Sequence, residues 1–179
     1  MVEAWDNRKP AGVSWGLGTA VVGGGVAGLH AAWDIARCGL EVTLIEKSPF
    51  LGGRMAQLES VFPTGERARE SLHDLIEKVL AHPRITVHTY SEVEHVSGFV
   101  GDYEVKIRKR ARSVDLVKCT GCGECLEKCP VKVPSEFEAG LATRGAIYRP
   151  FPQAVPNVPA IDREHCTYFL KDGKCGVCQ

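Results

Sequence analysis

Cys119-Thr-Gly-Cys122-Gly-Glu-Cys125-Leu-Glu-Lys-Cys129-Pro130 places four cysteines in the spacing C-x2-C-x2-C-x3-C, followed at once by proline. This spacing is the bacterial run that ligates iron–sulfur clusters. The short intervals let three thiolates converge on one cluster, whereas the fourth cysteine ligates the other cluster in two-cluster proteins. The run therefore predicts a second set of cysteines. A structural zinc site is the alternative, and it is disfavoured because zinc ribbons use paired C-x2-C knuckles.

The second set is Cys166-x8-Cys175-x2-Cys178, at the end of the sequence. By the crossed rule, the last cysteine of the first run joins these three around one [4Fe–4S] cluster. The ligands of this complete site are Cys129, Cys166, Cys175 and Cys178. The second [4Fe–4S] cluster has only three ligands in this chain, namely Cys119, Cys122 and Cys125. Three explanations fit the missing ligand: a fragmentary chain, a three-iron cluster, or a thiolate from another chain. The first is favoured.

Composition excludes several functional classes. The 179 residues are 44% hydrophobic and 25% charged, as in ordinary soluble globular proteins. A formal net charge of zero gives no support to a nucleic-acid partner, and the absence of a run of about 18 apolar residues argues against a membrane span. The sequence opens without a signal-peptide pattern, and cysteine ligands suit a reducing compartment, so a cytoplasmic location is expected. The eighth cysteine, Cys38, lies in a helical apolar pattern and is expected to be buried.

A glycine-rich motif follows the first predicted strand. The apolar run Thr19-Ala-Val-Val22 predicts a buried strand, and Gly23-Gly-Gly25-Val-Ala-Gly28 then supplies G-x-G-x-x-G. A helix is predicted over about 26–38, and a second buried strand over Glu41–Ile45 that ends at Glu46. Strand, glycines, helix and strand, with an acidic residue 18 positions after the last glycine, are typical of a dinucleotide-binding unit. The alternative is a βαβ unit with incidental glycines.

The motif residues have separate physical roles. Gly23 allows the tight turn, Gly25 lets the backbone approach a pyrophosphate, and Gly28 lets helix and strand pack closely. Backbone N–H groups at the helix N-terminus attract the phosphates. Glu46 accepts hydrogen bonds from ribose hydroxyls and argues against a 2′-phosphate. The predicted cofactor contacts of this unit are Gly23, Gly25, Val26, Ala27, Gly28 and Glu46.

A second glycine pair favours FAD over NAD. The run Lys47-Ser-Pro-Phe-Leu-Gly52-Gly53-Arg54-Met55 is similar to the glycine pair of two-dinucleotide-domain flavoproteins, which reaches the flavin side of the cofactor. Glycines permit close backbone approach, and Arg54 can meet phosphate or flavin oxygens. A plain Gly-Gly turn with a surface arginine is the alternative. The further predicted FAD contacts are Lys47, Gly52, Gly53, Arg54, Met55 and Val93, although a core role fits Val93 equally well.

The next segment predicts one helix and three strands. Thr64 is expected to cap a helix over about 66–81. Its apolar stripe at 3.6-residue spacing consists of Leu72, Leu75, Ile76, Val79 and Leu80. Strands are expected over 85–89, 92–96 and 99–108, the last two forming a β-meander.

The expected domains are an N-terminal extension at 1–17, an incomplete FAD-binding Rossmann-like domain at 18–112, and a ferredoxin-like [4Fe–4S] domain at 113–179 that ends inside its second cysteine motif. The predicted fold class is therefore α/β. A partial Rossmann-like FAD-binding βαβ unit with a β-meander is followed by an α+β two-cluster bacterial ferredoxin-like domain.

In this order, these motifs resemble the HdrA-like iron–sulfur flavoproteins of heterodisulfide reductase and their bacterial relatives, over nearly all of 18–179. The resemblance is carried by Val21–Gly28, Gly52-Gly-Arg-Met-Ala-Gln57, Phe62-Pro-Thr64, Tyr90–Val93, Cys119–Cys125, Cys129-Pro130 and Tyr148-Arg-Pro-Phe-Pro-Gln-Ala-Val-Pro156. It implies an FAD-containing iron–sulfur protein that passes electrons among flavin, clusters and partner subunits, with flavin-based electron bifurcation in some complexes. Many members carry a further cysteine segment where 65–75 has none, so that cluster is expected to be absent. The remainder of the family's flavin domain is also missing.

Two functional hypotheses follow. The first is an oxidoreductase component in which flavin exchanges two electrons and clusters carry them singly to partner subunits or to a protein donor or acceptor. No side chain is a convincing acid, base or nucleophile, so no catalytic residue is named. The second is a non-catalytic electron-relay and assembly module that docks to partner subunits. A third, a zinc-stabilised NAD-binding protein, predicts zinc in place of iron.

Overall fold

The chain folds into two compact units, in a computed structural model that describes residues 18–178. The boundary between the units lies after Ala111. The N-terminal extension expected at 1–17 lies outside the described residues. No helix within the described part of the chain is long and apolar enough to cross a membrane.

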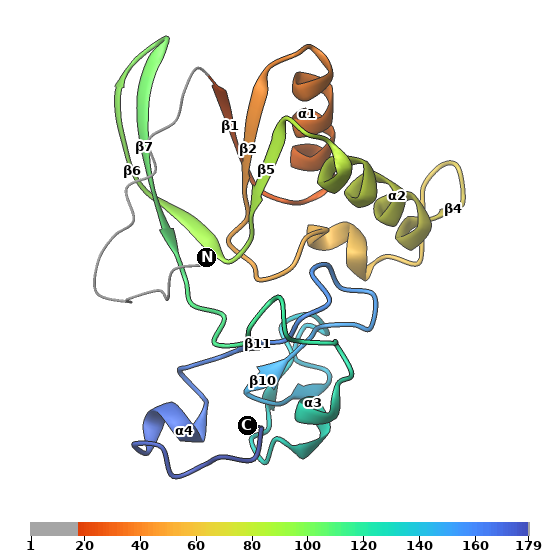
Figure 1. Ribbon diagram of the computed structural model, residues 1–179. Coiled ribbons are helices and arrows are strands. Elements are labelled where there is room, and N and C mark those ends of the chain that lie inside the picture. The colour runs from red at the N-terminus through yellow and green to blue at the C-terminus, as the bar shows by residue number, and fades with distance from the viewer. Residues whose placement is uncertain (1–17, 179) are drawn as a thin grey trace. The chain divides into compact units, whose positions relative to one another are not determined.

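A three-stranded parallel sheet forms the centre of the first unit (Figure 1). Its strands are β1 (Gly18–Val22), β2 (Glu41–Ile45) and β5 (Ile85–His88), in the order β1-β2-β5. Four consecutive residues of β2, Val42 to Ile45, are buried, as expected of a parallel strand with both faces covered. The expectation that Thr19–Val22 forms a buried strand was wrong in its burial, because β1 is an edge strand in which exposed and half-buried residues alternate.

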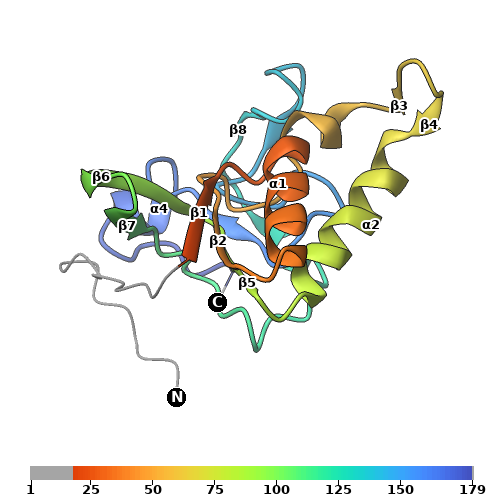
Figure 2. The ribbon, with the colours of Figure 1, turned by 90° about the horizontal axis from the view of Figure 1, so that it is seen from above.

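Two helices connect these strands and cover one face of the sheet (Figure 2). α1 (Val26–Arg37) links β1 to β2, and α2 (Ala68–Ala81) links β2 to β5. Right-handed crossovers between strands that follow one another in a single direction bring both helices to the same face. The predicted stripe of α2 is its buried face, except that Leu80 is exposed. The buried residues of the helices are Leu29, Ala32, Ala36, Ala68, Leu72, Leu75, Ile76 and Val79.

A short hairpin before α2 corrects the expected start of that helix. Its strands are β3 (Ser60–Val61) and β4 (Glu66–Arg67). Thr64 lies in the turn, where its hydroxyl donates a hydrogen bond to the carbonyl oxygen of Val61 at 3.4 Å. The helix begins later, at Ala68, and has no side-chain cap. The expectation that Thr64 caps this helix was therefore wrong.

The end of α1 corrects a second expectation. Cys38 is the C-cap of the helix and is exposed, so it is not a buried apolar residue. Gly39 follows in the left-handed region, at φ +91°. Its N–H donates to the carbonyl oxygen of Ala36 at 3.0 Å. The chain leaves the helix at Cys38, beyond the last residue that packs on the sheet.

The expected meander is a two-stranded antiparallel hairpin with its own sheet. Its strands are β6 (Ser91–Phe99) and β7 (Asp102–Lys109). A register shift between Val93 and His95 interrupts the pairing. The 3-10 helix η1 (Gly53–Gln57) lies earlier in the chain, between β2 and the short hairpin.

The second unit consists of short elements around a small core. These elements are α3 (Glu124–Lys128), β8 (Val133–Pro134), β9 (Thr143–Arg144), β10 (Ile147–Tyr148), β11 (Ala160–Ile161) and α4 (Thr167–Leu170). β8 pairs with β9 and β10 with β11, both antiparallel. The core residues are Cys129, Ala146, Ile147, Ile161 and Cys166. A core this small needs a further source of stability, such as bound metal.

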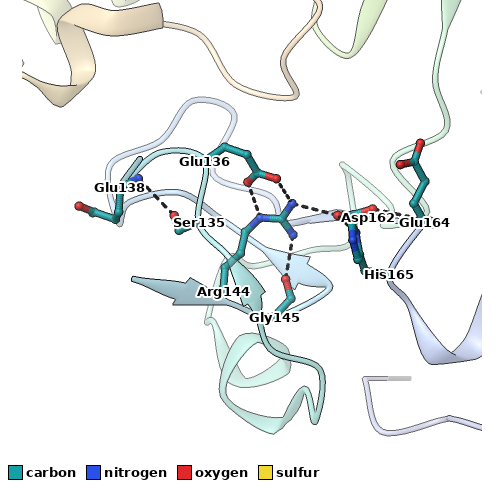
Figure 3. Close-up of polar contacts among 8 residues, drawn as sticks. All are labelled: Ser135, Glu136, Glu138, Arg144, Gly145, Asp162, Glu164 and His165. Carbon is teal, nitrogen blue, oxygen red and sulfur yellow. Dashed lines mark hydrogen bonds and ion pairs between the residues drawn. The ribbon is translucent and has the colours of Figure 1, made fainter. Parts of the chain in front are cut away.

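A charged network around Arg144 ties three segments of the second unit together (Figure 3). Its guanidinium donates two hydrogen bonds of 2.6 Å to Glu136 and one of 2.9 Å to Asp162. It also lies 3.9 Å from the ring centroid of Tyr148. Asp162 in turn contacts the His165 ring at 2.8 Å. Burial alone would raise the pKa of Asp162, but the hydrogen bonds from Arg144 and His165 hold that pKa below its usual range.

Arg144→Leu is expected to lower the free energy of unfolding by about 2–3 kcal/mol, because it leaves a half-buried carboxylate without its charged donor. Urea unfolding followed by circular dichroism under anaerobic conditions measures this loss. Lys128→Leu is the control, because Lys128 makes an exposed ion pair of 3.6 Å with Glu124 and such pairs contribute about 0.5 kcal/mol. Equal unfolding curves for the two variants would contradict a stabilising role for the network.

Candidate functional site

The phosphate-binding loop of the first unit joins β1 to α1. Gly23 has φ +109°, and a Cβ on Gly28 would lie 1.8 Å from the carbonyl oxygen of Gly23. Glycine at position 28 therefore lets α1 pack directly against the loop. Gly25 is the N-cap, without a side-chain cap and with no acidic residue in the first turn. The first N–H groups of a helix lack partners within the helix, so this end can receive an anionic group.

Glu46 closes the loop from the end of β2. One carboxylate oxygen accepts a hydrogen bond from the N–H of Gly24, and the other accepts one from the N–H of Ser48 at 2.6 Å. Each carboxylate oxygen has a second lone pair, so these contacts leave capacity for ribose hydroxyls. The structure adds a role that the motif alone does not predict. Glu46 braces the glycine loop through these two hydrogen bonds.

The second glycine pair lies against the first. The N–H of Gly52 donates to the carbonyl oxygen of Gly24 at 2.8 Å, and a parallel β-bridge joins Gly25 to Gly52. A Cβ on Gly53 would lie 3.1 Å from the Cα of Gly25. Two predicted cofactor segments, separated in the chain by α1 and β2, thus form one backbone cradle.

The other predicted FAD contacts are less closely grouped. Arg54 is exposed and Met55 half-buried, both in η1. Lys47 is exposed and lies 3.8 Å from a carboxylate oxygen of Glu92. Val93 is half-buried in β6, where it pairs with Ile107. Their role at a cofactor stays a prediction.

Four cysteines of the second unit line one cavity of about 270 Å³. They are Cys129, Cys166, Cys175 and Cys178, the set that the crossed spacing rule groups. Burial raises the pKa of the Cys178 thiol, and the neighbouring sulfurs of Cys166, Cys129 and Cys175 raise it further. Such a rise is expected where several thiols converge, because each thiolate repels the next.

The remaining walls of this cavity are mostly apolar. Ile147 and Ile161 come from the paired strands β10 and β11, and Val131 follows the cysteine run. Tyr168 and Phe169 of α4 also line it, with their rings edge to face at 5.3 Å. A largely apolar cavity with four thiols fits a [4Fe–4S] cluster, which takes four thiolate ligands and is tuned by solvent exposure.

Cys119 and Cys122 lie on a loop that leads into α3, and Cys125 lies in the first turn of α3; we call residues 119–125 the three-cysteine loop. Burial raises the pKa of the Cys125 thiol, and Cys119, Cys178 and Cys122 raise it further. Cys178 therefore lies near enough to influence both cysteine sets. Across residues 18–178, no three His, Cys, Asp or Glu side chains meet closely enough to hold a single metal ion.

Sequence reasoning missed two polar residues beside this loop. Arg149 donates hydrogen bonds to the carbonyl oxygen of Gly121, at 3.0 Å, and to the side chain of Asn157. Both lie in the proline-rich segment, which we define as residues 131–165 between the two cysteine sets. In this segment the sequence shows only the prolines and part of the family resemblance. The spacing of a cysteine motif carries no information about a residue that reaches its loop from 28 positions away.

Comparison with known proteins identifies both units. Residues 21–102 match the NAD(P)-binding Rossmann-like domain, and residues 113–135 match the 4Fe-4S binding domain. The HdrA iron–sulfur protein of the CoB–CoM heterodisulfide reductase of Methanocaldococcus jannaschii is 48% identical over 159 residues, which are 89% of this chain and 23% of that protein. The chain belongs to the HdrA-like family of heterodisulfide reductase. This confirms the resemblance and, with the two domain matches, the predicted mixed α/β fold class.

Members of the HdrA-like family are much longer than this chain. One of the HdrA proteins of Methanopyrus kandleri is 54% identical over 138 residues, covering 77% of this chain and 21% of that protein. The chain thus spans about a fifth of the length of these relatives. Among solved structures, the L-proline dehydrogenase from P. horikoshii matches over 52% of this chain and 19% of its own, with a TM-score of 0.46 and 23% identity.

Gly25→Ala is expected to weaken dinucleotide binding, whereas Gly28→Ala is expected to disturb the packing of α1 on the loop. Alanine fits at position 25, where φ is −80° and the nearest atom is 3.9 Å away, but its methyl group occupies the approach to the loop. Dinucleotide affinity should fall about tenfold, as overpacking by one methyl costs about 1–3 kcal/mol. Alanine at position 28 should instead lower the free energy of unfolding by a similar amount. Fluorescence titration and urea unfolding measure the two effects, and unfolding losses of the same size in both variants would contradict the assignment.

Proposed function

We propose that this chain is an FAD- and [4Fe–4S]-containing electron-transfer portion of a heterodisulfide reductase-like oxidoreductase complex. Electrons would pass between flavin, clusters and partner subunits, in the reducing environment of the cytoplasm that thiolate ligands suit. The observation that carries the proposal is the convergence of four cysteines on one largely apolar cavity. The HdrA relatives support it, because their names describe iron–sulfur proteins of a CoB–CoM heterodisulfide reductase.

The four-cysteine cavity is assigned to one [4Fe–4S] cluster. Cys129 and Cys166 are buried in the core and fix two ligand positions, whereas Cys175 and Cys178 approach from the C-terminal segment. Tyr168 and Phe169 line the same cavity and keep water from it. When bound, the cluster supplies one-electron chemistry at a potential set by hydrogen bonds, net charge and solvent exposure. The chain's own contribution is to hold these thiols and exclude water.

The three-cysteine loop is assigned to the second cluster. Its thiols share an electrostatic neighbourhood with Cys178, since both Cys178 and the loop sulfurs raise the pKa of Cys125. Neighbouring clusters are the arrangement that a relay of single electrons needs. The loop itself contributes three thiolates, and a four-iron cluster there requires a fourth ligand from beyond the loop.

FAD is assigned to the glycine cradle of the first unit. The contact of Gly24 with Gly52 joins the phosphate loop to the second glycine pair, and Glu46 braces the loop from the end of β2. Flavin exchanges electrons in pairs and clusters accept them singly, so the two cofactor types together convert one kind of transfer into the other. No residue of the chain is given a role as acid, base or nucleophile.

A second candidate function is an electron-relay and assembly module without turnover of its own. The three-cysteine loop favours it, because a partner that supplies the fourth thiolate would be fixed to the chain by a metal–sulfur bond. Addition of the partner subunits should then raise the iron content of the loop. Iron content that is independent of partners would exclude this assembly role.

Iron and acid-labile sulfide analysis after anaerobic reconstitution tests the cluster assignment. The four-cysteine site alone predicts about four irons for each chain, and both sites together predict about eight. Cys166→Ala should remove about four irons. Cys38→Ala should remove none, because Cys38 is an exposed residue at the end of α1. A colourless protein that binds zinc, or equal loss of iron in the two variants, would refute the assignment.

Parallel titrations with FAD and NAD test the choice of dinucleotide. The cradle of Gly24 and Gly52 should bind FAD more tightly than NAD, with quenching of flavin fluorescence as the signal. Gly52 has φ +112° and a Cβ there would lie 2.9 Å from Leu72, so Gly52→Ala should abolish the preference by displacing the second glycine pair. Tighter binding of NAD to the unaltered protein would overturn the FAD assignment.

A further inference from the structure

The three-cysteine loop rests closely on Asn157, which belongs to the proline-rich segment. Gly121 lies between Cys119 and Cys122, at φ +73°. A Cβ at this position would lie 2.6 Å from the side-chain nitrogen of Asn157 and 2.7 Å from the backbone carbonyl oxygen of Asn157. Only glycine allows the loop to approach Asn157 in this way. Asn157 therefore packs directly against the backbone of Gly121, between Cys119 and Cys122.

Arg149 reaches the same point from the end of β10. Its Nη1 donates one hydrogen bond to the carbonyl oxygen of Gly121 at 3.0 Å and a second to the side-chain oxygen of Asn157. Its Nη2 lies 3.9 Å from where a Cβ on Gly123 would stand. The guanidinium thus spans the loop between its two left-handed glycines. Because Arg149 precedes Pro150, its backbone is restricted to extended conformations, which helps to fix the direction of the side chain.

The charge of Arg149 is not balanced by a carboxylate. Over the described range 18–178, no ion pair joins Arg149 to an Asp or Glu side chain. Arg144, in the same unit, makes ion pairs with both Glu136 and Asp162. The two arginines therefore differ in function. Arg144 is neutralised within the fold, whereas the half-buried Arg149 presents a net positive charge to the three-cysteine loop.

A positive charge beside an iron–sulfur site favours the reduced state, because reduction adds one negative charge to the cluster. We propose that Arg149 is a positioning residue that holds the three-cysteine loop and raises the reduction potential of its cluster. The proposal rests on the cluster assigned to that loop under the proposed function. It also gives the proline-rich segment a role, which is to deliver Arg149 and Asn157 to the loop.

Redox titration of the reconstituted chain, followed by electron paramagnetic resonance, tests this role. 2-Mercaptoethanol is added as the exogenous fourth thiolate, and dithionite supplies the electrons. The unaltered protein should show two reduction waves. In Arg149→Gln one wave should shift to lower potential while the other stays in place. Arg149→Lys keeps the charge and should return the shifted wave toward its original position.

Arg163→Gln is the matched control. Arg163 donates to the Ser113 hydroxyl at 3.1 Å and lies 4.5 Å from the ring centroid of Phe169. Ser113 and Phe169 both line the four-cysteine cavity. This variant should leave the Arg149-sensitive wave unchanged. Asn157→Ala removes a neutral partner and should shift that wave less than Arg149→Gln does.

The outcomes separate this proposal from the proposed function. A chain that takes up no iron refutes the proposed function itself. If both reduction waves keep their potentials in Arg149→Gln, the proposed role of Arg149 is overturned, while the proposed function is unaffected. The role is also overturned if the unaltered protein shows only one wave, since the loop then holds no cluster to tune. Loss of iron from both Arg149→Gln and Arg149→Lys would overturn the charge effect, because a residue that kept the charge would then fail to restore the site.

Discussion

Convergence of thiol side chains within a very small core is the constraint on which the second unit depends. Cys129 and Cys166 are at once core residues and candidate ligands. No residue of α3 or α4 is fully buried, and Cys125 and Leu126 of α3 are only partly buried against the core, so apolar packing alone holds these helices weakly. Metal–sulfur bonds can supply what the core lacks, and in such domains metal binding and folding become one process. The Arg144 network then orients the segments around the site.

The first unit uses a different principle, which is contact between backbone segments. Gly28 lets α1 touch Gly23, and Gly24 bonds to both Glu46 and Gly52. These contacts are possible because the residues are glycines, so a few glycine positions determine the shape of the loop. The loop is consequently assembled from parts of the chain that do not rely on the cysteine-rich unit. The residues named for each candidate cofactor site thus come from a single unit.

The sequence predicted the elements whose patterns arise from burial or from close approach. β2 has the predicted bounds, and α1 ends within one residue of its expected end, because buried runs and glycine motifs are local signals. Thr64 was misassigned because a hairpin turn and a helix cap use the same side-chain chemistry. Cys38 was misassigned because helical periodicity does not show where the chain leaves the helix. The contact of Arg149 with Gly121 joins residues far apart in sequence, and no local pattern encodes it.

The position of β1 at the edge of the sheet, among the residues that the structure describes, has a consequence for handling the protein. Within the part of the chain that the structure describes, β2 is the one strand that pairs with β1. Residues Thr19 to Val22 carry no charge and no proline, which are the usual guards against unwanted strand addition. Val22, beside the glycine loop, is 66% exposed. Self-association through this edge would begin next to the dinucleotide loop, so aggregation and loss of nucleotide binding would occur together.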